Sequence, residues 1–338
     1  MRLIAAFEGQ AISCRSLGSP FMGRLMTLFA NRLTPESGAV AARLFGWAGD
    51  PSSRRGSLPL RLASGFHALA LSGHAGLAAV YPPQDAPDDA LWSAIETALI
   101  SEETFLLDWV ESPPQTNEVR RAAIFRAAGQ WLAARHGLPL ELCELGASAG
   151  LNLHWDRYAL DVAGTHFGPP DAVLTVTPDW TGPPPPMAEP SVAARRGVDL
   201  NPLDPVADRL RLLAYLWPDQ PHRLDLTEAA LCLPPAPVDQ GCAADWLDTL
   251  PAQTDGTCRL IQHSVAWQYF PSDVQTRAAA TIARLGAAAT ETKPLAHLAM
   301  EAADGRGAAV TLTTWPGGTV HAAGRADFHG RWVAWHLT

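Results

Sequence analysis

The sequence lacks clusters of positive charge. Its 338 residues contain 25 lysines and arginines against 34 aspartates and glutamates, so the formal net charge is −9. Nucleic acids and anionic membranes are bound through clustered cations that contact phosphates. We therefore expect no nucleic-acid partner and no membrane partner, and we expect a small-molecule substrate.

The sequence also lacks the cysteine patterns of disulfide-rich and zinc-binding proteins. The five cysteines form no C-x-x-C pair, and no histidine and carboxylate residues are grouped at the spacing of metal ligands. The cysteines are Cys14, Cys143, Cys232, Cys242 and Cys258. They are typical of reduced thiols, and the sequence implies no metal.

Long apolar runs are absent as well. The longest, residues 65–81, is too short to span a bilayer and includes His67 and His74. The apolar stretch 3–7 ends at Glu8, so it does not resemble a secretory signal. These features predict a cytoplasmic protein, and nothing in the sequence indicates its oligomeric state.

Residues 1–137 show little strand signal, and we predict that they form a helical N-terminal cap. The segments with apolar residues at helical spacing are 20–33, 88–110 and 117–136. The last is the clearest, since Asn117 can cap its start, and Gly137 and Pro139 can end it.

Residues 138–338 alternate predicted strands and helices, which indicates an α/β fold with a Rossmann-like, doubly wound sheet. Strands are expected at 140–145, 197–200, 259–264, 295–301, 309–315, 320–323 and 332–336, and helices at 151–158, 204–217 and 272–285. Residues 158–190 alternate around turn-forming residues, which predicts a β-hairpin insertion.

The segment from Glu144 to Gly150, ELGASAG, lies between the first of these strands and a helix. Its glycines and small residues allow backbone to approach a ligand closely, and free N–H groups at a helix start favour a polar or anionic group. It does not match the G-x-G-x-x-G pattern of dinucleotide folds. It resembles instead the first motif of class I methyltransferases, in which an acidic residue ends the strand.

Several longer motifs together resemble the DUF2332 family of bacterial proteins of unknown function, which is assigned to Rossmann-like, methyltransferase-like folds. They are CRSLGSPFMGRLM (14–26), ELGASAGLNLHWDRY (144–158), RRGVDLNPLD (195–204), LWPDQ (216–220), HSVAWQYF (263–270) and, at the end, WPGG and HGRWVAWH (329–336). The resemblance covers nearly the whole chain. It implies a methyltransferase-type sheet and an S-adenosylmethionine-dependent methyltransferase whose small-molecule acceptor the sequence does not identify.

By this resemblance, the methionine end of S-adenosylmethionine would contact Glu144, Gly146, Ser148 and Gly150. Asp199, at the end of the next strand, would hold the ribose hydroxyls. The alternatives are a purely structural turn at 146–150, and a role for Asp199 in turning the chain at Asn201 and Pro202.

The adenine end of the cofactor would lie at Gly241, Cys242 and Ala243. Family members tend to have an aspartate where this chain has Cys242, so a carboxylate is missing here. The backbone N–H of Ala243 is then the group left to recognise adenine.

His263 and Tyr269 follow the strand at 259–264 and are the candidate catalytic residues. A histidine near its ordinary pKa of about 6.5 can deprotonate an acceptor. Tyr269, with Trp267, could line the acceptor site. A structural histidine and core aromatics are the alternatives.

The same loop also reads G-x-S-x-G, the nucleophile elbow of α/β-hydrolases. Ser148 would then be the nucleophile, with Asp304 or Asp327 as the acid and His329 as the base. No HGGG-like oxyanion loop precedes it. A third alternative is a non-catalytic protein that binds a nucleotide or cofactor.

Overall fold

The computed structural model describes residues 2–53 and 55–338, which form two compact units. The first comprises the residues up to 116 together with 207–225, and the second comprises 117–206 and 226–338. The division lies at 116 rather than at the expected 137, because the helix expected over 117–136 packs within the second unit.

The described part of the first unit is helical. Its elements are α1 (Arg2–Ser16), α2 (Pro20–Arg32), η1 (Pro35–Ser37), α3 (Ala39–Phe45), α4 (Leu58–Leu71), α5 (Ala75–Ala78), α6 (Asp88–Ser101), α7 (Glu103–Glu111) and α9 (Arg209–Ala214); the boundary between the units falls within α10 (Pro221–Ala230). The expected helix 88–110 is thus two helices that meet at Glu102. No described helix has the length and apolarity needed to cross a membrane.

Residues 207–225 join the first unit through Asp219. Ser19 caps α2 by accepting the N–H of Met22, and its hydroxyl donates to Asp219 Oδ1 over 2.6 Å. The N–H of Phe21 donates to Asp219 Oδ2 over 2.9 Å. Both oxygens of one carboxylate thus bind the start of a helix, where unpaired N–H groups favour negative charge.

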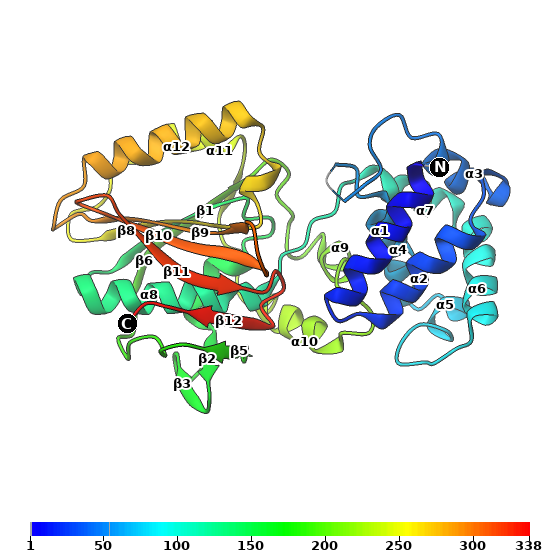
Figure 1. Ribbon diagram of the computed structural model, residues 1–338, viewed down its shortest axis with the longest axis horizontal. Helices are drawn as coiled ribbons and strands as arrows, with labels where there is room; N and C mark the ends of the chain where they lie inside the picture. Colours follow the sequence, from blue (N-terminus) through cyan, green and yellow to red (C-terminus); the bar gives the residue numbers. More distant parts are fainter. Residues whose placement is uncertain (1, 54) are drawn as a thin grey trace. The chain divides into compact units, whose positions relative to one another are not determined.

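The second unit is built on a nine-stranded, mostly parallel sheet (Figure 1). Its strands, in spatial order, are β5 (Asp179–Thr181), β12 (Trp332–Trp335), β11 (Thr319–Ala326), β10 (Ala308–Trp315), β9 (Leu295–Ala302), β8 (Cys258–Ser264), β1 (Leu140–Leu145), β6 (Val192–Asp199) and β7 (Val238–Gln240). The sheet confirms the predicted α/β class.

Five neighbouring strands, β7, β6, β1, β8 and β9, are parallel. Numbered in chain order they follow the spatial order 3-2-1-4-5, so the order reverses between β1 and β8. Doubly wound sheets bind ligands outside the carboxyl ends of their strands at such a reversal. All of β1 is buried, as expected for a strand with neighbours on both sides and helices on both faces.

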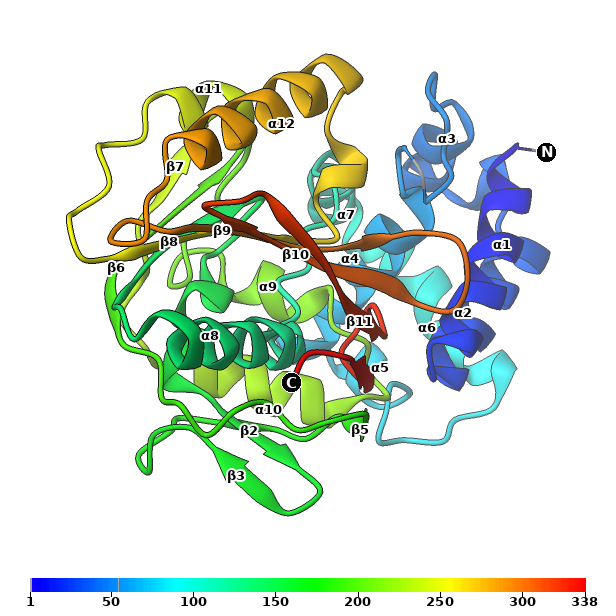
Figure 2. The same cartoon turned by 60° about the vertical axis from the view of Figure 1, so that its left-hand side comes forward.

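Helices cover both faces of this sheet (Figures 1 and 2). On one face lie α11 (Ala243–Asp248) and α12 (Ser272–Ala287), and on the other lies α8 (Ala122–His136). The short 3-10 helices are η2 (Val119–Arg121), η3 (Leu151–Arg157) and η4 (Trp267–Tyr269). The predicted stop of α8 is confirmed, since Gly137 ends it with a φ of +64°.

The insertion contains the predicted hairpin, formed by β2 (Ala159–Val162) and β3 (Thr165–Phe167). It also contains β4 (Thr175–Val176), which pairs with β2, and β5, which joins the large sheet beside β12. Arg126 of α8 anchors it, because this buried guanidinium donates to Phe167 O and to both oxygens of Glu189.

Three local predictions are corrected. The segment after the glycine-rich loop is a 3-10 helix, and it is irregular at His154. The helix expected at 204–217 is limited to α9. The strand expected at 197–200 is longer, because β6 begins at Val192, just after the insertion, and ends at Asp199.

Candidate functional site

The glycine-rich loop leaves the carboxyl end of β1, at the reversal of strand order. Three of its residues have positive φ: Gly146 at +70°, Ser148 at +53° and Gly150 at +73°. The N–H groups of Gly146 and Ala147 both donate to Val198 O, over 2.9 and 3.1 Å. The loop is therefore fixed to the end of β6.

Both glycines are also required by packing inside the protein. A Cβ atom on Gly146 would lie 2.5 Å from the Cβ of Ala266, in the turn after β8. A Cβ on Gly150 would lie 2.9 Å from a methyl group of Val238 in β7. The glycines thus let neighbouring strand ends approach the loop, which sequence reasoning assigned to a ligand.

Asp199, at the end of β6, contacts the loop directly. Its Oδ2 accepts the N–H of Ser148 over 2.9 Å, and its Oδ1 accepts the N–H of Asn201 over 2.9 Å. The expected turn at Asn201 is therefore present, and the same carboxylate also orients the loop. A carboxylate oxygen can accept a second hydrogen bond, so these contacts are compatible with binding a hydroxyl group.

Glu144 is a buried acid at the end of β1, only 2% exposed. The Nε2 of Gln262 in β8 lies 3.4 Å from its Oε2, and the indole of Trp155 donates to Gln262 Oε1 over 3.1 Å. Burial raises the pKa of Glu144 to about 8, against the lowering effects of Gln262 and of the positive charge on Arg121. Glu144 therefore holds a proton at neutral pH in the protein alone.

The segment Asn117–Arg121 completes this polar cluster, and sequence reasoning did not identify its role. Asn117 was expected to cap a helix at 117–136, but its Oδ1 accepts the N–H of Leu151, directly after the loop. The side chain of Asn152 donates to Glu118 O over 3.2 Å. The helix α8 begins only at Ala122 because Val119–Arg121 form a 3-10 turn.

Arg121 joins the chain's last turn to the end of β8. Its Nε donates to Phe328 O over 2.9 Å and its Nη1 to Ser264 O over 3.1 Å. The side chain is buried, so its charge acts through a medium of low polarity. From this position the positive charge of Arg121 lowers the pKa of Glu144. This effect is weaker than that of burial.

His263 lies on the opposite face of the sheet from Glu144. Side chains alternate along a strand, and Ile261, two residues earlier, packs with α11 and α12. The Nδ1 of His263 lies 2.7 Å from Glu301 Oε1, its Nε2 lies 3.0 Å from His297 Nε2, and Trp267 stacks on its ring at 5.0 Å. Both imidazole nitrogens are thus engaged within the protein.

Two partners of His263, Glu301 and His297 of β9, were not identified from the sequence. Burial and the neighbouring His263 lower the pKa of His297 to about 3. Residues 297, 299 and 301 share one face of β9, which pairs with β8. The alternation of side chains along β9 was therefore the signal that could have placed His297 and Glu301 on the same face.

The other candidate residues lie at the same edge of the sheet. Cys242 follows β7 and is the N-cap residue of α11, and Ala243 is buried beneath it. Tyr269 ends η4 and is 61% exposed, whereas Trp267 is the aromatic residue that contacts His263. Within residues 2–53 and 55–338, no three or more histidine, cysteine or acidic side chains converge as they would around a metal ion.

Asp327, one of the two candidate acids of the alternative hydrolase triad, has other partners. Asp327 Oδ2 accepts a guanidinium N–H of Arg331 over 2.6 Å, and its Oδ1 accepts the backbone N–H of His329 over 3.0 Å. Arg331 also donates its Nε to Oδ1. This carboxylate therefore forms an ion pair within its own turn.

The family profile described as "Uncharacterized protein conserved in bacteria (DUF2332)" matches residues 4–335. The chain belongs to the DUF2332 family. A search of the curated proteins and a search of the solved structures found no match. The membership confirms the resemblance seen in the sequence, and the activity of this DUF2332 protein has to be argued from its site.

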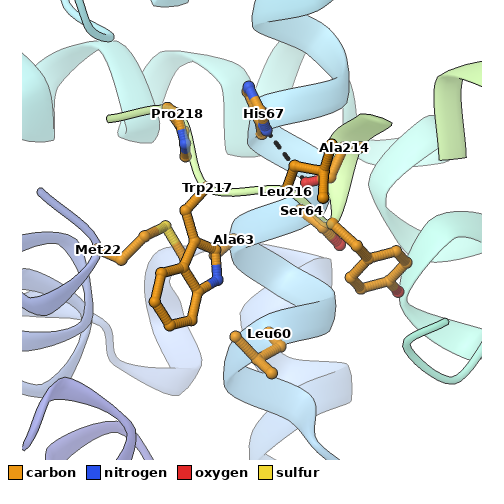
Figure 3. Close-up of a pocket in the computed structure, with 10 residues that line it drawn as sticks. Met22, Leu60, Ala63, Ser64, His67, Ala214, Leu216, Trp217 and Pro218 are labelled. Atoms are coloured by element: carbon orange, nitrogen blue, oxygen red, sulfur yellow. Dashed lines mark hydrogen bonds between the residues drawn. The ribbon is translucent and has the colours of Figure 1, made fainter. Parts of the chain in front are cut away.

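The first unit contains a small cavity beneath α4 (Figure 3). Its volume of about 10 Å³ is close to the least that holds a single water molecule. His67 borders it and lies 3.1 Å, through Nδ1, from Ala214 O. Burial lowers the pKa of His67 to about 4, so this histidine is a neutral structural group.

Proposed function

We propose that this DUF2332 protein binds S-adenosylmethionine at the carboxyl ends of β1, β6 and β7 and transfers its methyl group to a small-molecule acceptor. The observation that carries the proposal is the contact between Ser148 and Asp199. It joins the loop after the first parallel strand to an acid at the end of the second, beside the reversal of strand order. Methyltransferase-type sheets place the cofactor's methionine and ribose parts at these two strand ends.

The residues at this edge suit such a ligand. Glu144 has one long hydrogen bond, from Gln262, and would accept an ammonium group after losing its proton. Asp199 places a carboxylate, the acceptor that ribose hydroxyls require, at the end of β6 and in contact with the loop. The backbone of Ala243, with Cys242 beside it, is left for adenine, where no side-chain carboxylate is available from residue 242.

When bound, the cofactor would supply a methyl group already activated on a sulfonium. The chain's own contribution is then to bind and orient the two reactants and to exclude water. His263 is buried with both nitrogens bonded, so we assign it to the framework of the site. Transfer to an acceptor that is already nucleophilic needs no dedicated base.

A serine hydrolase is the second candidate, and one observation favours it. Ser148 has a φ of +53°, and a nucleophile elbow likewise holds its serine in a strained turn between strand and helix. It ranks second because Asp327 is paired with Arg331 and the other candidate acid, Asp304, is exposed. Ser148→Ala would abolish the turnover of activated esters if this candidate were correct.

Calorimetric titration with S-adenosylmethionine and S-adenosylhomocysteine tests the proposal, with NAD as the negative control. We expect micromolar binding of the first two only. Glu144→Gln should weaken it about 10–100-fold, since a hydrogen bond to a charged group contributes about 1.5–3 kcal/mol. Glu141→Gln is the matched control, because Glu141 lies at the amino end of the same strand and pairs with Arg259.

The outcomes separate the candidates. Binding that Glu144→Gln weakens and Glu141→Gln leaves unchanged supports the proposal. Absence of binding to the wild-type protein overturns it, and ester turnover that depends on Ser148 would replace it with the hydrolase. Binding without methyl transfer to any acceptor would make the protein a cofactor-binding protein rather than an enzyme.

A further inference from the structure

The turn after β8 has an unfavourable backbone conformation. Val265 has a φ of +52°, which is rare for any residue with a side chain and a clear outlier for a β-branched one. Such strain persists only where surrounding contacts determine the conformation. Most of the contacts that do so here come from β9.

Glu301 of β9 supplies most of them through a single oxygen. Its Oε1 accepts the N–H of Ala266 over 3.0 Å, the N–H of Trp267 over 3.1 Å and the Nδ1–H of His263 over 2.7 Å. Burial raises the pKa of Glu301, but these hydrogen bonds and His263 outweigh it and hold the pKa below its usual value. Glu301 is therefore ionised at neutral pH.

Two further contacts tie the side chains of the turn together. Trp267 stacks on His263 with an angle of 20° between the ring planes, and His263 Nε2 is bonded to His297 of β9. Gln275 of α12 donates to Trp267 O over 2.9 Å. The turn is thus held from β9 and from α12.

The turn after β8 also limits the position of the glycine-rich loop. Ala266 occupies the space where a side chain at residue 146 would lie, with its Cβ 2.5 Å from that position. Ser264, at the start of the turn, accepts a hydrogen bond from Arg121 through its carbonyl. A displacement of Ala266 would therefore remove one wall of the loop.

We propose that Glu301 is a positioning residue for the glycine-rich loop, which it places by fixing Ala266 and Trp267 in the turn after β8. Glu301 does not touch the ligand in this proposal. It acts through Ala266 on Gly146, on the face of the sheet opposite Glu144. The positioning role can be tested without a ligand, and it rests on the proposed function only in the experiment that measures ligand affinity.

Hydrogen–deuterium exchange of the ligand-free protein tests the positioning directly. In Glu301→Ala we expect the amides of Ala266 and Trp267 to exchange at least 10-fold faster, and the loop 146–150 to exchange faster as well. Glu301→Gln keeps an acceptor oxygen and should restore most of the protection. Exchange unchanged at 146–150 in Glu301→Ala would overturn the proposal.

Glu141→Gln is again the control, because Glu141 also collects several donors, from Thr254, Thr257 and Arg259, but at the other end of the sheet. It should lower the melting temperature without faster exchange at 146–150. Equal loop exchange in both variants would reduce Glu301 to a general stabilising residue and refute the positioning role. The proton NMR signal of His263 Nδ1–H should disappear in Glu301→Ala and should remain in Glu141→Gln.

Affinity for S-adenosylhomocysteine separates this proposal from the proposed function. If the wild-type protein binds it and Glu301→Ala binds at least 10-fold more weakly while remaining folded, both stand. If Glu301→Ala binds as the wild type does, the positioning role fails and the function stands. If the wild type does not bind, the function fails, and the exchange pattern alone supports or overturns the positioning role.

Discussion

Replacing Glu144 by glutamine should stabilise the protein, and increasingly so at higher pH. Burial raises the pKa of Glu144 from 4.5 to about 8. The folded protein then holds this proton more tightly than the unfolded chain does, so stability falls as the pH rises from 4.5 to 8 and stays reduced above that. At 1.36 kcal/mol for each pKa unit, the full cost is at most about 5 kcal/mol.

Glutamine cannot ionise and has nearly the same shape, so Glu144→Gln avoids this cost. Guanidinium unfolding of both proteins without ligand, followed by circular dichroism, gives the difference in unfolding free energy. We expect it to be under about 1 kcal/mol at pH 5 and several kcal/mol in favour of the variant at pH 9. Other titrating groups are common to both proteins and cancel.

A difference that stays constant between pH 5 and pH 9 would refute the reasoning, since it would mean that Glu144 ionises as freely in the folded protein as in the unfolded chain. Glu141→Gln gives the opposite sign. Burial raises the pKa of Glu141, but bonds from Thr254 and Arg259 outweigh it and leave the pKa below its usual value. The ionised form of Glu141 therefore stabilises the protein, and its removal should cost stability at both pH values.

Two further substitutions test the packing that supports the site. Gly129→Ala places a Cβ 2.2 Å from the ring of buried Trp155 and should destabilise by about 1–2 kcal/mol in thermal unfolding, whereas Gly9→Ala, with no atom within 4 Å, should be neutral or stabilising. Arg126→Ala removes the buried anchor of the insertion and should cost about 2–3 kcal/mol in chemical unfolding. Its control, Arg196→Ala, removes an exposed ion pair and should cost under about 1 kcal/mol. Equal effects of Gly129→Ala and Gly9→Ala, or of Arg126→Ala and Arg196→Ala, would contradict these assignments.

Local patterns in the sequence were sufficient for the elements that hold the candidate loop. The apolar run at 140–145 and the glycines after it predicted a buried strand followed by a tight loop, and both are present. Gly137 ends α8 as predicted, because a glycine adopts the left-handed conformation readily and a proline follows at 139. Such features depend on a few adjacent residues, so the sequence displays them directly.

The partners across the sheet could not be predicted in this way. Asn117 was assigned to the nearest helix, but its acceptor is used 34 residues later, by Leu151. His263 was assigned to catalysis because its structural partner, Glu301, is 38 residues away along the chain and the sequence does not show that the two residues meet. Nothing in local spacing reports which strands become neighbours, and that order decides both contacts.

The same contacts change which residue best reports on a ligand. The sequence points to the glycines as contacts of the cofactor, so replacing Gly146 or Gly150 by a larger residue is the obvious test of cofactor binding. In the structure, the space beside Gly146 is filled by Ala266 and that beside Gly150 by Val238. Both substitutions would disturb the packing whether or not a ligand binds there, so loss of binding in them would prove little. Glu144 is buried, weakly bonded and costly to ionise, and only a cationic or hydrogen-bonding ligand would relieve that cost. The decisive evidence for a cofactor at this edge is therefore to be sought at Glu144.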